Sequence, residues 1–307
     1  LLNSVYDKLD KQSQQKVGEL RVHKPVEVLF EGVNTDIFFK TTDVSNDLAE
    51  EMSNIKENFC FLYVGHWLQG AHGHERKDIA GVIKTFCQTF RANPSSTRPA
   101  LILKTSGATF SVIDREDCLR KIREIKSSFG ENCPNVYLLH GDMTPQELNQ
   151  LYNHSKVKAH ISFTHGEGFG RPLLEASISG KPVIAPNWSG HIDFLAPNSI
   201  LLPGDLRQVH PSAVWKDVII EQSSWYYVNY GYASKIIKDV FKNYKKYIPN
   251  ARKQAKLSRE AFSLDKMKED FKKIFEEKVV LQEEVKLSLP KLNASKKITL
   301  PKLTAVK

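Results

Sequence analysis

Short apolar runs alternate with amphipathic stretches through the first two thirds of the chain. Apolar runs typical of buried strands end near Val64, Leu103, Leu139, Phe163 and Ala185. Between them, apolar residues recur every three or four positions, as in amphipathic helices, near residues 77–92, 115–129, 145–154 and 171–179. Strands that alternate with helices predict an α/β fold built on a doubly wound parallel sheet.

The pattern is different at the two ends of the chain. Residues 1–33 contain one helix-like polar run, followed by an apolar run that predicts a strand over Val26–Phe30. From about Ala233 to Glu277 the pattern is helical, with apolar residues at spacings of three and four: Ile236, Ile237, Val240, Phe241 and Tyr244. We therefore expect helices to follow the sheet, and an extended tail after them.

A glycine-rich stretch, Gly166–Ala176, places Glu167 and Glu175 eight positions apart. It joins the apolar run at residues 157–163 to a helical stretch that has Pro172 in its first turn, where a missing N–H costs nothing. Backbone amides at such a junction bind anions and hydroxyls, and glycines let a ligand approach closely. The two carboxylates suit the hydroxyls of a sugar nucleotide, and the alternative is a tight turn with a solvated carboxylate.

Residues 162–194, SFTHGEGFGRPLLEASISGKPVIAPNWSGHIDF, resemble the donor-site signature of retaining GT-B glycosyltransferases of group 1, which include glycogen synthases, sucrose synthases and mannosyltransferases. The resemblance implies a Rossmann-like donor domain in which Glu167 contacts the transferred sugar and Glu175 holds the ribose. It also implies that backbone amides cradle the sugar and diphosphate, namely those of Gly168, Phe169, Gly170 and Arg171. His165 would lie beside the donor sugar, or would be a histidine that only packs the loop.

Upstream, residues 58–86 resemble the strand, glycine loop and helix that receive the diphosphate in this family. Lys77 falls where a diphosphate-binding lysine is expected, and Arg76 is a weaker candidate. After Gly65 this chain has His66 where many members have arginine. Either His66 is protonated beside the diphosphate, or another cation compensates, such as Arg171 or Lys104.

Two further positions follow predicted strands and point to the same site. Lys104 ends an apolar run, and ligands bind beyond the carboxyl ends of strands in open parallel sheets. The alternative for Lys104 is a surface lysine. His140, Gly141 and Met143 occupy the place where members of the family bring backbone and an apolar side chain against the nucleotide base.

The resemblance divides the chain into four segments. We expect residues 1–36 to be the remnant of an N-terminal acceptor domain with its linker, and residues 37–224 to form the nucleotide-sugar domain. Residues 225–278 would be C-terminal cross-over helices, and residues 279–307 a basic tail. That tail holds two 11-residue repeats around Leu-Pro-Lys-Leu, which predict an arm that pairs with a partner or a plain flexible tail.

The net charge of +9 lies at the C-terminal end of the chain. Residues 235–307 contain 20 Lys and Arg against 9 Asp and Glu, whereas residues 1–234 contain 24 against 26. A basic arm can bind nucleic acid, anionic lipid or an acidic protein, although the interspersed acids also fit a solvated helix face.

Cysteine spacing and apolar runs bear on the compartment. The four cysteines, which form no Cys-x-x-Cys pair, predict buried thiols in a reducing compartment: Cys60, Cys87, Cys118 and Cys133. No apolar run is long enough to span a membrane, and cytoplasm is the expected location. A metal bound by His66, His72, His74 and Glu75 is disfavoured, because glycines separate these residues and the resemblance to GT-B enzymes implies transfer without a metal.

The favoured hypothesis is a retaining glycosyltransferase that takes its sugar from a nucleotide-diphosphate donor such as a UDP- or GDP-sugar. The acceptor is open: a glycan, a lipid-linked sugar, a protein or a modified DNA base. The alternative is a non-catalytic or partner-dependent module that binds a sugar nucleotide, because the acceptor domain is nearly absent from this chain. A sugar-phosphate epimerase on the same architecture ranks last, since no acid/base pair is visible.

Overall fold

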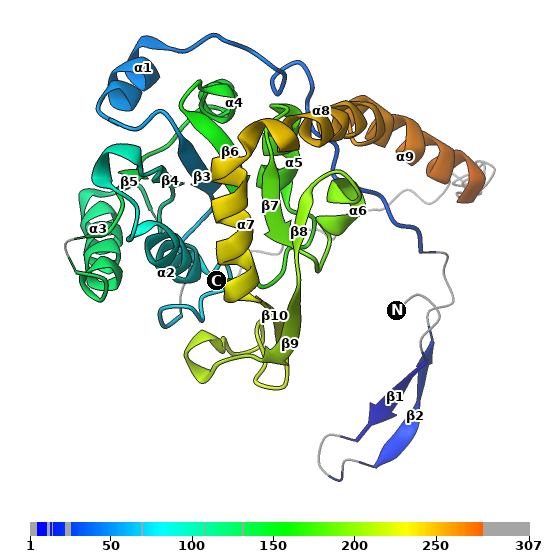
Figure 1. Ribbon diagram of the computed structural model, residues 1–307. Coiled ribbons are helices and arrows are strands. Elements are labelled where there is room, and N and C mark those ends of the chain that lie inside the picture. Colours follow the sequence, from blue (N-terminus) through cyan, green and yellow to red (C-terminus); the bar gives the residue numbers. More distant parts are fainter. Residues whose placement is uncertain are drawn as a thin grey trace, which may run out of the picture. The chain divides into compact units, whose positions relative to one another are not determined.

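Six parallel strands form the sheet at the centre of the larger of two units, residues 27–271 (Figure 1). The computed structural model describes residues 5–10, 13, 15–21, 26–68, 70–107, 109–130 and 132–278. The strand order is β5-β4-β3-β6-β7-β8, so consecutive strands run outward from β3 in one direction and from β6 in the other. This is the order of a classic doubly wound nucleotide-binding fold.

The strands of this sheet are short and mostly buried, as expected where helices cover both faces. Their bounds are β3 (Cys60–Val64), β4 (Ala100–Lys104), β5 (Val136–Leu139), β6 (Val157–Ile161), β7 (Val183–Pro186) and β8 (Ile200–Leu202). The helices among them are α1 (Asn46–Ser53), α2 (Ile79–Phe90), α3 (Val112–Ser127), α4 (Pro145–Asn153), α5 (Arg171–Ile178) and α6 (Ile192–Leu195).

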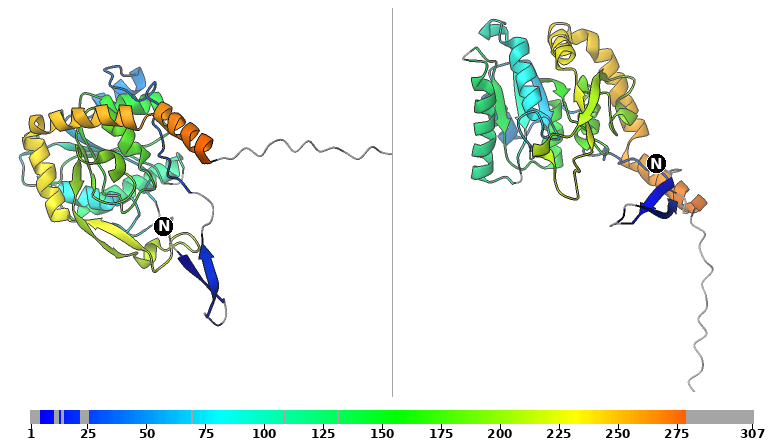
Figure 2. Two further views of the ribbon diagram at one scale, coloured as in Figure 1. Left: turned by 90° about the vertical axis from the view of Figure 1, so that its right-hand side faces the viewer. Right: turned by 90° about the horizontal axis from the view of Figure 1, so that it is seen from below.

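Alternate residues of each strand enter two separate apolar cores. Phe61 and Tyr63 of β3 pack with α2, α3 and α7 (Tyr230–Lys242) on one face, and Cys60 and Leu62 pack with α1, α4, α5 and α6 on the other. Helices therefore flank the sheet on both sides (Figure 2). The prediction of a doubly wound α/β sheet followed by C-terminal helices is confirmed.

Three helices follow the sheet: α7 (Tyr230–Lys242), α8 (Tyr244–Ala261) and α9 (Leu264–Lys278). The predicted helical stretch is thus interrupted at Asn243 and again near Ser263. At the second break, the Val33 N–H donates to Phe262 O at 2.9 Å and the Leu264 N–H donates to Val33 O at 2.7 Å. The segment before the sheet is in this way joined to the helices after it.

The sequence did not reveal an antiparallel hairpin between β8 and α7. Strands β9 (Gly204–Gln208) and β10 (Ser224–Val228) pair over their whole length, and the turn between them contains a short 3₁₀ helix at Pro211–Ala213. Most of β9 is exposed, whereas Trp225, Tyr226 and Tyr227 of β10 are buried. This hairpin lies at the carboxyl end of the sheet, at the bottom of Figure 1.

Two expectations for the N-terminal region were wrong. The helix-like polar run contains two antiparallel strands instead, β1 (Val5–Leu9) and β2 (Lys16–Arg21), which belong to the smaller unit of residues 1–26 and 272–307. Residues 26–30 form no strand, and Val26 and Val28 are exposed. Alternating apolar residues there mimic a strand but have no partner strand to pair with.

The cysteines are only partly the free thiols that were expected. Cys60 and Cys118 are buried and free, but Cys87 on α2 forms a disulfide with Cys133, with Cα atoms 5.4 Å apart. Spacing in the sequence did not indicate this pair, because α2 and the segment before β5 meet only in the folded chain. None of the helices in the described ranges is both long and apolar enough to cross a membrane. The repeats at residues 286–307 lie outside the described residues.

Candidate functional site

The strand order reverses between β3 and β6, so the loops that follow these two strands diverge and leave a crevice at the carboxyl edge of the sheet. Residues 65–78 follow β3, and residues 162–170 follow β6. Both loops contain residues that the sequence singled out. The fold therefore brings together two motifs that lie about 90 positions apart.

The loop after β3 is anchored by two buried carboxylates, Glu75 and Asp78. Glu75 accepts hydrogen bonds from the Gly73 and Ala80 amides, both at 2.8 Å. Asp78 caps α2 by accepting from the Gly81 amide at 3.0 Å, and the hydroxyl of Tyr230 on α7 also donates to it. Arg76 and Lys77 are held between these anchors. Sequence reasoning considered Glu75 only as a disfavoured metal ligand and missed Asp78, although an aspartate directly before a helix is a recognisable cap.

The loop after β6 is anchored to the segment that follows β7. The Glu167 amide donates to Ser189 Oγ at 2.9 Å, and the Gly190 amide donates to Glu167 O at 3.2 Å. A Cβ on Gly190 would lie 2.0 Å from the Gly168 carbonyl oxygen, so only glycine permits this approach. Gly170 has φ +95°, a left-handed conformation that favours glycine, and it caps α5. Ser189 and Gly190 were also missed.

Lys77 and Glu167 meet inside the crevice. The Lys77 ammonium donates to Glu167 Oε1, and Arg76 Nη1 lies 3.5 Å from Glu167 Oε2. Arg76 also donates to Gly166 O at 2.8 Å. The Lys77 and Glu167 side chains are each 10% exposed. Two cations and a carboxylate from different loops therefore share a poorly solvated site.

Burial and charge act in opposite directions on this pair. Burial raises the pKa of Glu167, but Lys77 and then Arg76 outweigh it and hold the pKa below its usual value. Burial lowers the pKa of Lys77, while Glu167 opposes that shift. With its pKa lowered, Glu167 is ionised at neutral pH and accepts hydrogen bonds only.

Glu175 lies about one turn into α5, in different surroundings. It is 4% exposed and accepts from Arg171 Nε at 3.1 Å and from the Tyr152 hydroxyl at 3.4 Å. Burial raises the pKa of Glu175, and the bonds from Arg171 and Tyr152 only partly offset it. Tyr152, on α4, was not predicted to take part.

His165 joins the loop after β6 to the hairpin. Its Nδ1 lies 2.8 Å from the Tyr226 carbonyl oxygen, and its ring packs against Trp225 and Tyr227. Burial lowers the pKa of His165 to about 4, so the imidazole is neutral at physiological pH. These contacts orient the ring toward β10.

Gly65, His66 and Lys104 lie on neighbouring strand ends. The Gly65 amide donates to Lys104 O at 3.1 Å, and His66 Nδ1 is 3.3 Å from Ser106 Oγ. The Lys104 ammonium donates to Gly141 O at 2.6 Å, and burial lowers its pKa, with Asp142 opposing the shift. Lys104 is therefore half-buried at the edge of the crevice, not a free surface lysine.

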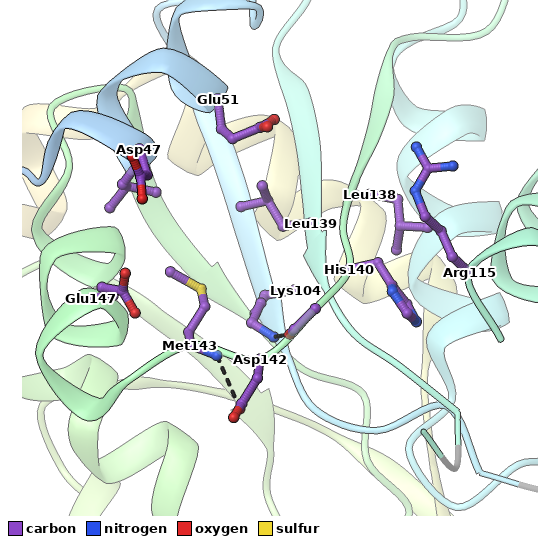
Figure 3. Close-up of a pocket in the computed structure, with 12 residues that line it drawn as sticks. Asp47, Glu51, Lys104, Arg115, Leu138, Leu139, His140, Asp142, Met143 and Glu147 are labelled. Carbon is purple, nitrogen blue, oxygen red and sulfur yellow. Dashed lines mark hydrogen bonds between the residues drawn. The ribbon is translucent and has the colours of Figure 1, made fainter. Parts of the chain in front are cut away.

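A hollow of about 340 Å³ continues from Lys104 along β5. Lys104, His140, Gly141 and Met143 line it, with Leu138 and Leu139 as apolar neighbours and Asp47, Glu51 and Glu147 at its rim (Figure 3). His140 Nε2 lies 2.7 Å from Asp114 Oδ2 on α3, which fixes its ring. Apolar side chains form part of the wall of this hollow, and charged side chains and backbone polar groups form the rest.

The segment Gly168–Arg171 leads into α5, and the first amides of any helix have no partner within it. Phe169 turns inward and packs on Phe194, with ring centroids 5.1 Å apart. The Arg171 side chain is 64% exposed, and its guanidinium pairs with Glu175. The positive end of α5 follows the loop that carries Glu167, the residue that Lys77 contacts.

The candidate metal ligands diverge from one another. His74 stacks on His210 with ring centroids 4.0 Å apart, His72 lies 3.9 Å from Glu124, and His66 contacts Ser106. In the part of the chain that the structure describes, no three His, Cys, Asp or Glu side chains are arranged to hold a metal ion.

Solved structures share this architecture, an open parallel α/β domain whose strand order reverses between two central strands. Sucrose-phosphate synthase from Thermosynechococcus elongatus aligns with a TM-score of 0.54 and 17% identity over 80% of this chain and 51% of its own. Anabaena HepE, in complex with UDP-glucose, aligns with 0.57 and 15% over 82% and 57%. This chain thus spans about half the length of these proteins.

A third structure matches a domain alone. The C-terminal domain of a group 1 family glycosyl transferase, LpcC from Francisella tularensis, aligns with a TM-score of 0.52 and 14% identity over 76% of this chain and all of that domain. Residues 120–205 match the family described as Glycosyl transferases group 1. A comparison with curated proteins gave no match. Residues 120–205 thus match the group 1 glycosyltransferase family, and the chain has the fold of a GT-B C-terminal domain; together these two findings confirm the resemblance seen in the sequence.

Proposed function

We propose that this domain binds a sugar nucleotide in the crevice between β3 and β6 and acts as the donor side of a retaining glycosyltransferase. The observation that carries the proposal is the meeting of Lys77, Arg76 and Glu167 where the strand order reverses. Cations beside the amides of a helix start suit a diphosphate, and a carboxylate among them suits sugar hydroxyls. Sucrose-phosphate synthase and HepE, which share the fold, are consistent with this reading.

In this proposal each part of the crevice has one task. Lys77, Arg76 and the amides from Gly168 to Arg171 stabilise the charge that develops on the leaving diphosphate. Glu167 accepts from hydroxyls of the transferred sugar, and Glu175 accepts from those of the ribose. The bond from the sugar C1 to the diphosphate oxygen breaks, the acceptor oxygen bonds to C1 on the same face, and the acceptor's hydroxyl proton passes to the leaving diphosphate, so no nucleophilic carboxylate is needed.

The hollow along β5 takes the nucleotide base. Its apolar walls suit a planar ring, while the backbone at Gly141 and Met143 offers hydrogen-bonding groups to the ring edge. Lys104 lines this hollow, and His66 lies in the loop that follows β3. These two residues are the candidates for a second cation that contacts the diphosphate. We assign His165 a positioning role, because its ring bonds to Tyr226 and holds the loop that carries Glu167.

A second candidate is a binding module whose transfer activity depends on another domain. It is favoured by the match to all of an isolated C-terminal domain, and to about half of two longer proteins. Both candidates require the donor crevice. They differ in whether this chain turns a bound donor over.

Isothermal titration of the whole chain against UDP-glucose, GDP-mannose, ADP-glucose and the matching free nucleosides tests the donor crevice. We expect micromolar binding of one sugar nucleotide and much weaker binding of its nucleoside. Release of free sugar from the bound donor would favour the transferase, and tight binding without release would favour the module. Absence of binding to every donor would overturn both.

A further inference from the structure

A second hollow, of about 320 Å³, lies at the other end of the sheet from the donor crevice. Ser179 and Lys181 border it from the turn that precedes β7, and Tyr244, Arg252 and Arg259 border it from α8. Lys40 completes it from the segment before α1. In Figure 1, α8 crosses the top of the sheet, whereas the hairpin that packs on the donor loops lies at the bottom. This second hollow and the donor crevice are therefore separate sites.

The lining of this hollow carries positive charge alone. Four of its ten lining residues are basic and none is acidic. Arg252 and Arg259 are seven positions apart on α8, which is two helical turns, so both face the hollow. Within the described ranges, the guanidinium groups of Arg252 and Arg259 and the ammonium of Lys40 form no ion pair with a carboxylate.

Lys181 adds a fixed basic group whose hydrogen-bond partners are uncharged. Its ammonium donates to the carbonyl oxygens of Tyr152 and His154, both at 2.8 Å, and these partners carry no formal charge. Burial, followed by repulsion from Lys158, lowers the pKa of Lys181 to about 7. An anion in the hollow would favour the charged form of Lys181.

Neighbouring lysines show what partnered cations look like on the same helices. Lys246 lies 3.6 Å from Asp239, and Lys256 lies 3.9 Å from Glu260. Residues 230–261 contain nine Lys and Arg against two Asp and Glu, so carboxylates are too few to pair with all of them. The positive surface continues along α7 and α8 beyond the hollow itself.

We propose that this hollow binds a phosphate group of a ligand other than the sugar-nucleotide donor. Paired guanidinium groups suit phosphate oxygens, because their planar N–H groups donate in a fixed geometry. The phosphate comes from a free phosphorylated molecule or from a phosphodiester backbone. The basic surface outside the hollow favours the backbone, since it would contact further phosphates. The inference does not depend on the proposed function.

The test compares two double variants of the whole chain that remove the same charge from α8. Arg252→Gln with Arg259→Gln removes both guanidinium groups from the hollow. Lys245→Gln with Lys253→Gln removes two exposed cations of the same helix that do not line it. Inorganic phosphate and a 12-nucleotide single-stranded DNA are titrated separately at constant ionic strength. The NMR chemical shift of the Gly180 backbone amide reports binding at this site, because Gly180 lines the hollow next to the Arg252 side chain.

We expect the arginine double variant to bind phosphate about tenfold more weakly, since two charge-assisted contacts are lost, and the lysine double variant to change about twofold or less. Tighter binding of the DNA than of phosphate, reduced by the same arginine changes, would identify a backbone as the source. Equal or weaker binding of the DNA would support a free phosphorylated ligand. Equal losses in the two double variants, or no shift at Gly180 in the native chain, would overturn the proposal.

Thermal unfolding of both double variants separates binding from folding. Cations at the end of a helix also offset its carbonyl charge, and Arg252 lies next to the end of α5. If the arginine variant unfolds earlier but keeps native phosphate affinity, its arginines only stabilise α5 and the proposed site is wrong. Lys77→Gln, in the donor crevice, should leave the phosphate-dependent shift at Gly180 unchanged.

Discussion

Glu167 lies in a loop and Glu175 in the helix that follows it, yet the pKa values of the two carboxyl groups are shifted in opposite directions. Glu167 meets a buried ammonium and a guanidinium, which together overcome burial and lower its pKa. Glu175 meets one exposed arginine and a neutral tyrosine hydroxyl, and burial raises its pKa. Two glutamates of one motif thus differ in how readily they ionise.

The difference comes from residues far away in the chain. Lys77 and Arg76 follow β3, and Tyr152 belongs to α4, so neither environment can be read from the motif itself. An ionised carboxylate beside two cations can accept hydrogen bonds from a sugar that lies next to a charged diphosphate. A carboxyl with a raised pKa takes up a proton more readily, so Glu175 is the more easily neutralised of the two proposed hydroxyl acceptors.

Removing the Lys77 ammonium is expected to have the largest effect on ligand binding. Lys77→Gln should weaken sugar-nucleotide binding about 100-fold, about 2.7 kcal/mol, because a buried charge-assisted bond to the diphosphate is lost. Binding of the bare nucleoside should change by less than about threefold, as it lacks the diphosphate. Titration calorimetry measures both, with Lys84→Gln on exposed α2 surface as the control. An equal loss for donor and nucleoside would refute the diphosphate assignment.

Exchanging each carboxylate for its amide tests the two environments through stability. Glu167→Gln should lower the free energy of unfolding by about 2 kcal/mol, because it leaves the buried Lys77 without its counter-charge. Glu175→Gln should change it by less than about 1 kcal/mol, since an amide still accepts from Arg171 and Tyr152. Urea unfolding at pH 7 gives both values. Equal losses would mean that the two environments do not differ as described.

The sequence predicted the sheet well and the contacts within the site poorly, for one reason. Buried parallel strands such as Cys60–Val64 are continuous apolar runs, and the helices between them have a clear period, so local pattern was enough. The predicted strand over Val26–Phe30 was wrong, because alternating apolar residues form a strand only where a partner strand is available to pair with. The hairpin from Gly204 to Val228 was missed because β9 is short, polar and exposed.

In the site, the sequence located the residues but not their partners. The position of Lys77 before a helix and the spacing of Glu167 and Glu175 are visible in the chain, whereas the contact of Lys77 with Glu167 exists only after β3 and β6 become neighbours. The same holds for His165, whose ring bonds to Tyr226 of a hairpin 61 residues later. Anchors such as Ser189 carry no signature that a single sequence reveals.

Truncating the second glutamate sharpens the comparison on the ligand side. Glu175→Ala should weaken a sugar nucleotide and its bare nucleoside by the same factor, about tenfold or 1.4 kcal/mol, because both carry the ribose that this carboxylate is proposed to hold. The equal effect on the two ligands contrasts with Lys77→Gln, which acts on the donor alone. The same calorimetric series measures it. Unchanged nucleoside affinity in Glu175→Ala would remove the ribose assignment.

The smallest effect, about 1 kcal/mol or less, is a pair of opposite pH slopes. A carboxyl with a lowered folded pKa gives stability above the unfolded glutamate value, and this is lost as pH falls through the folded pKa. A carboxyl with a raised folded pKa gives stability below the unfolded value, and this is lost as pH rises through the folded pKa. The stability of the native chain relative to Glu167→Gln should therefore rise with pH in mild acid, and relative to Glu175→Gln it should fall.

Urea unfolding of the native chain and both variants in steps from about pH 3 to 7 measures these slopes, since ordinary glutamate titrates near 4.3 and the pKa of Glu167 lies lower. Subtracting each variant cancels the titration of every other carboxyl, because those groups are common to both proteins. Slopes of the same sign would show that Lys77 and Arg76 do not hold Glu167 ionised. If the stability difference between the native chain and Glu175→Gln does not change with pH, burial does not raise the pKa of Glu175. The proposed ribose site would then contain a carboxylate with an ordinary pKa.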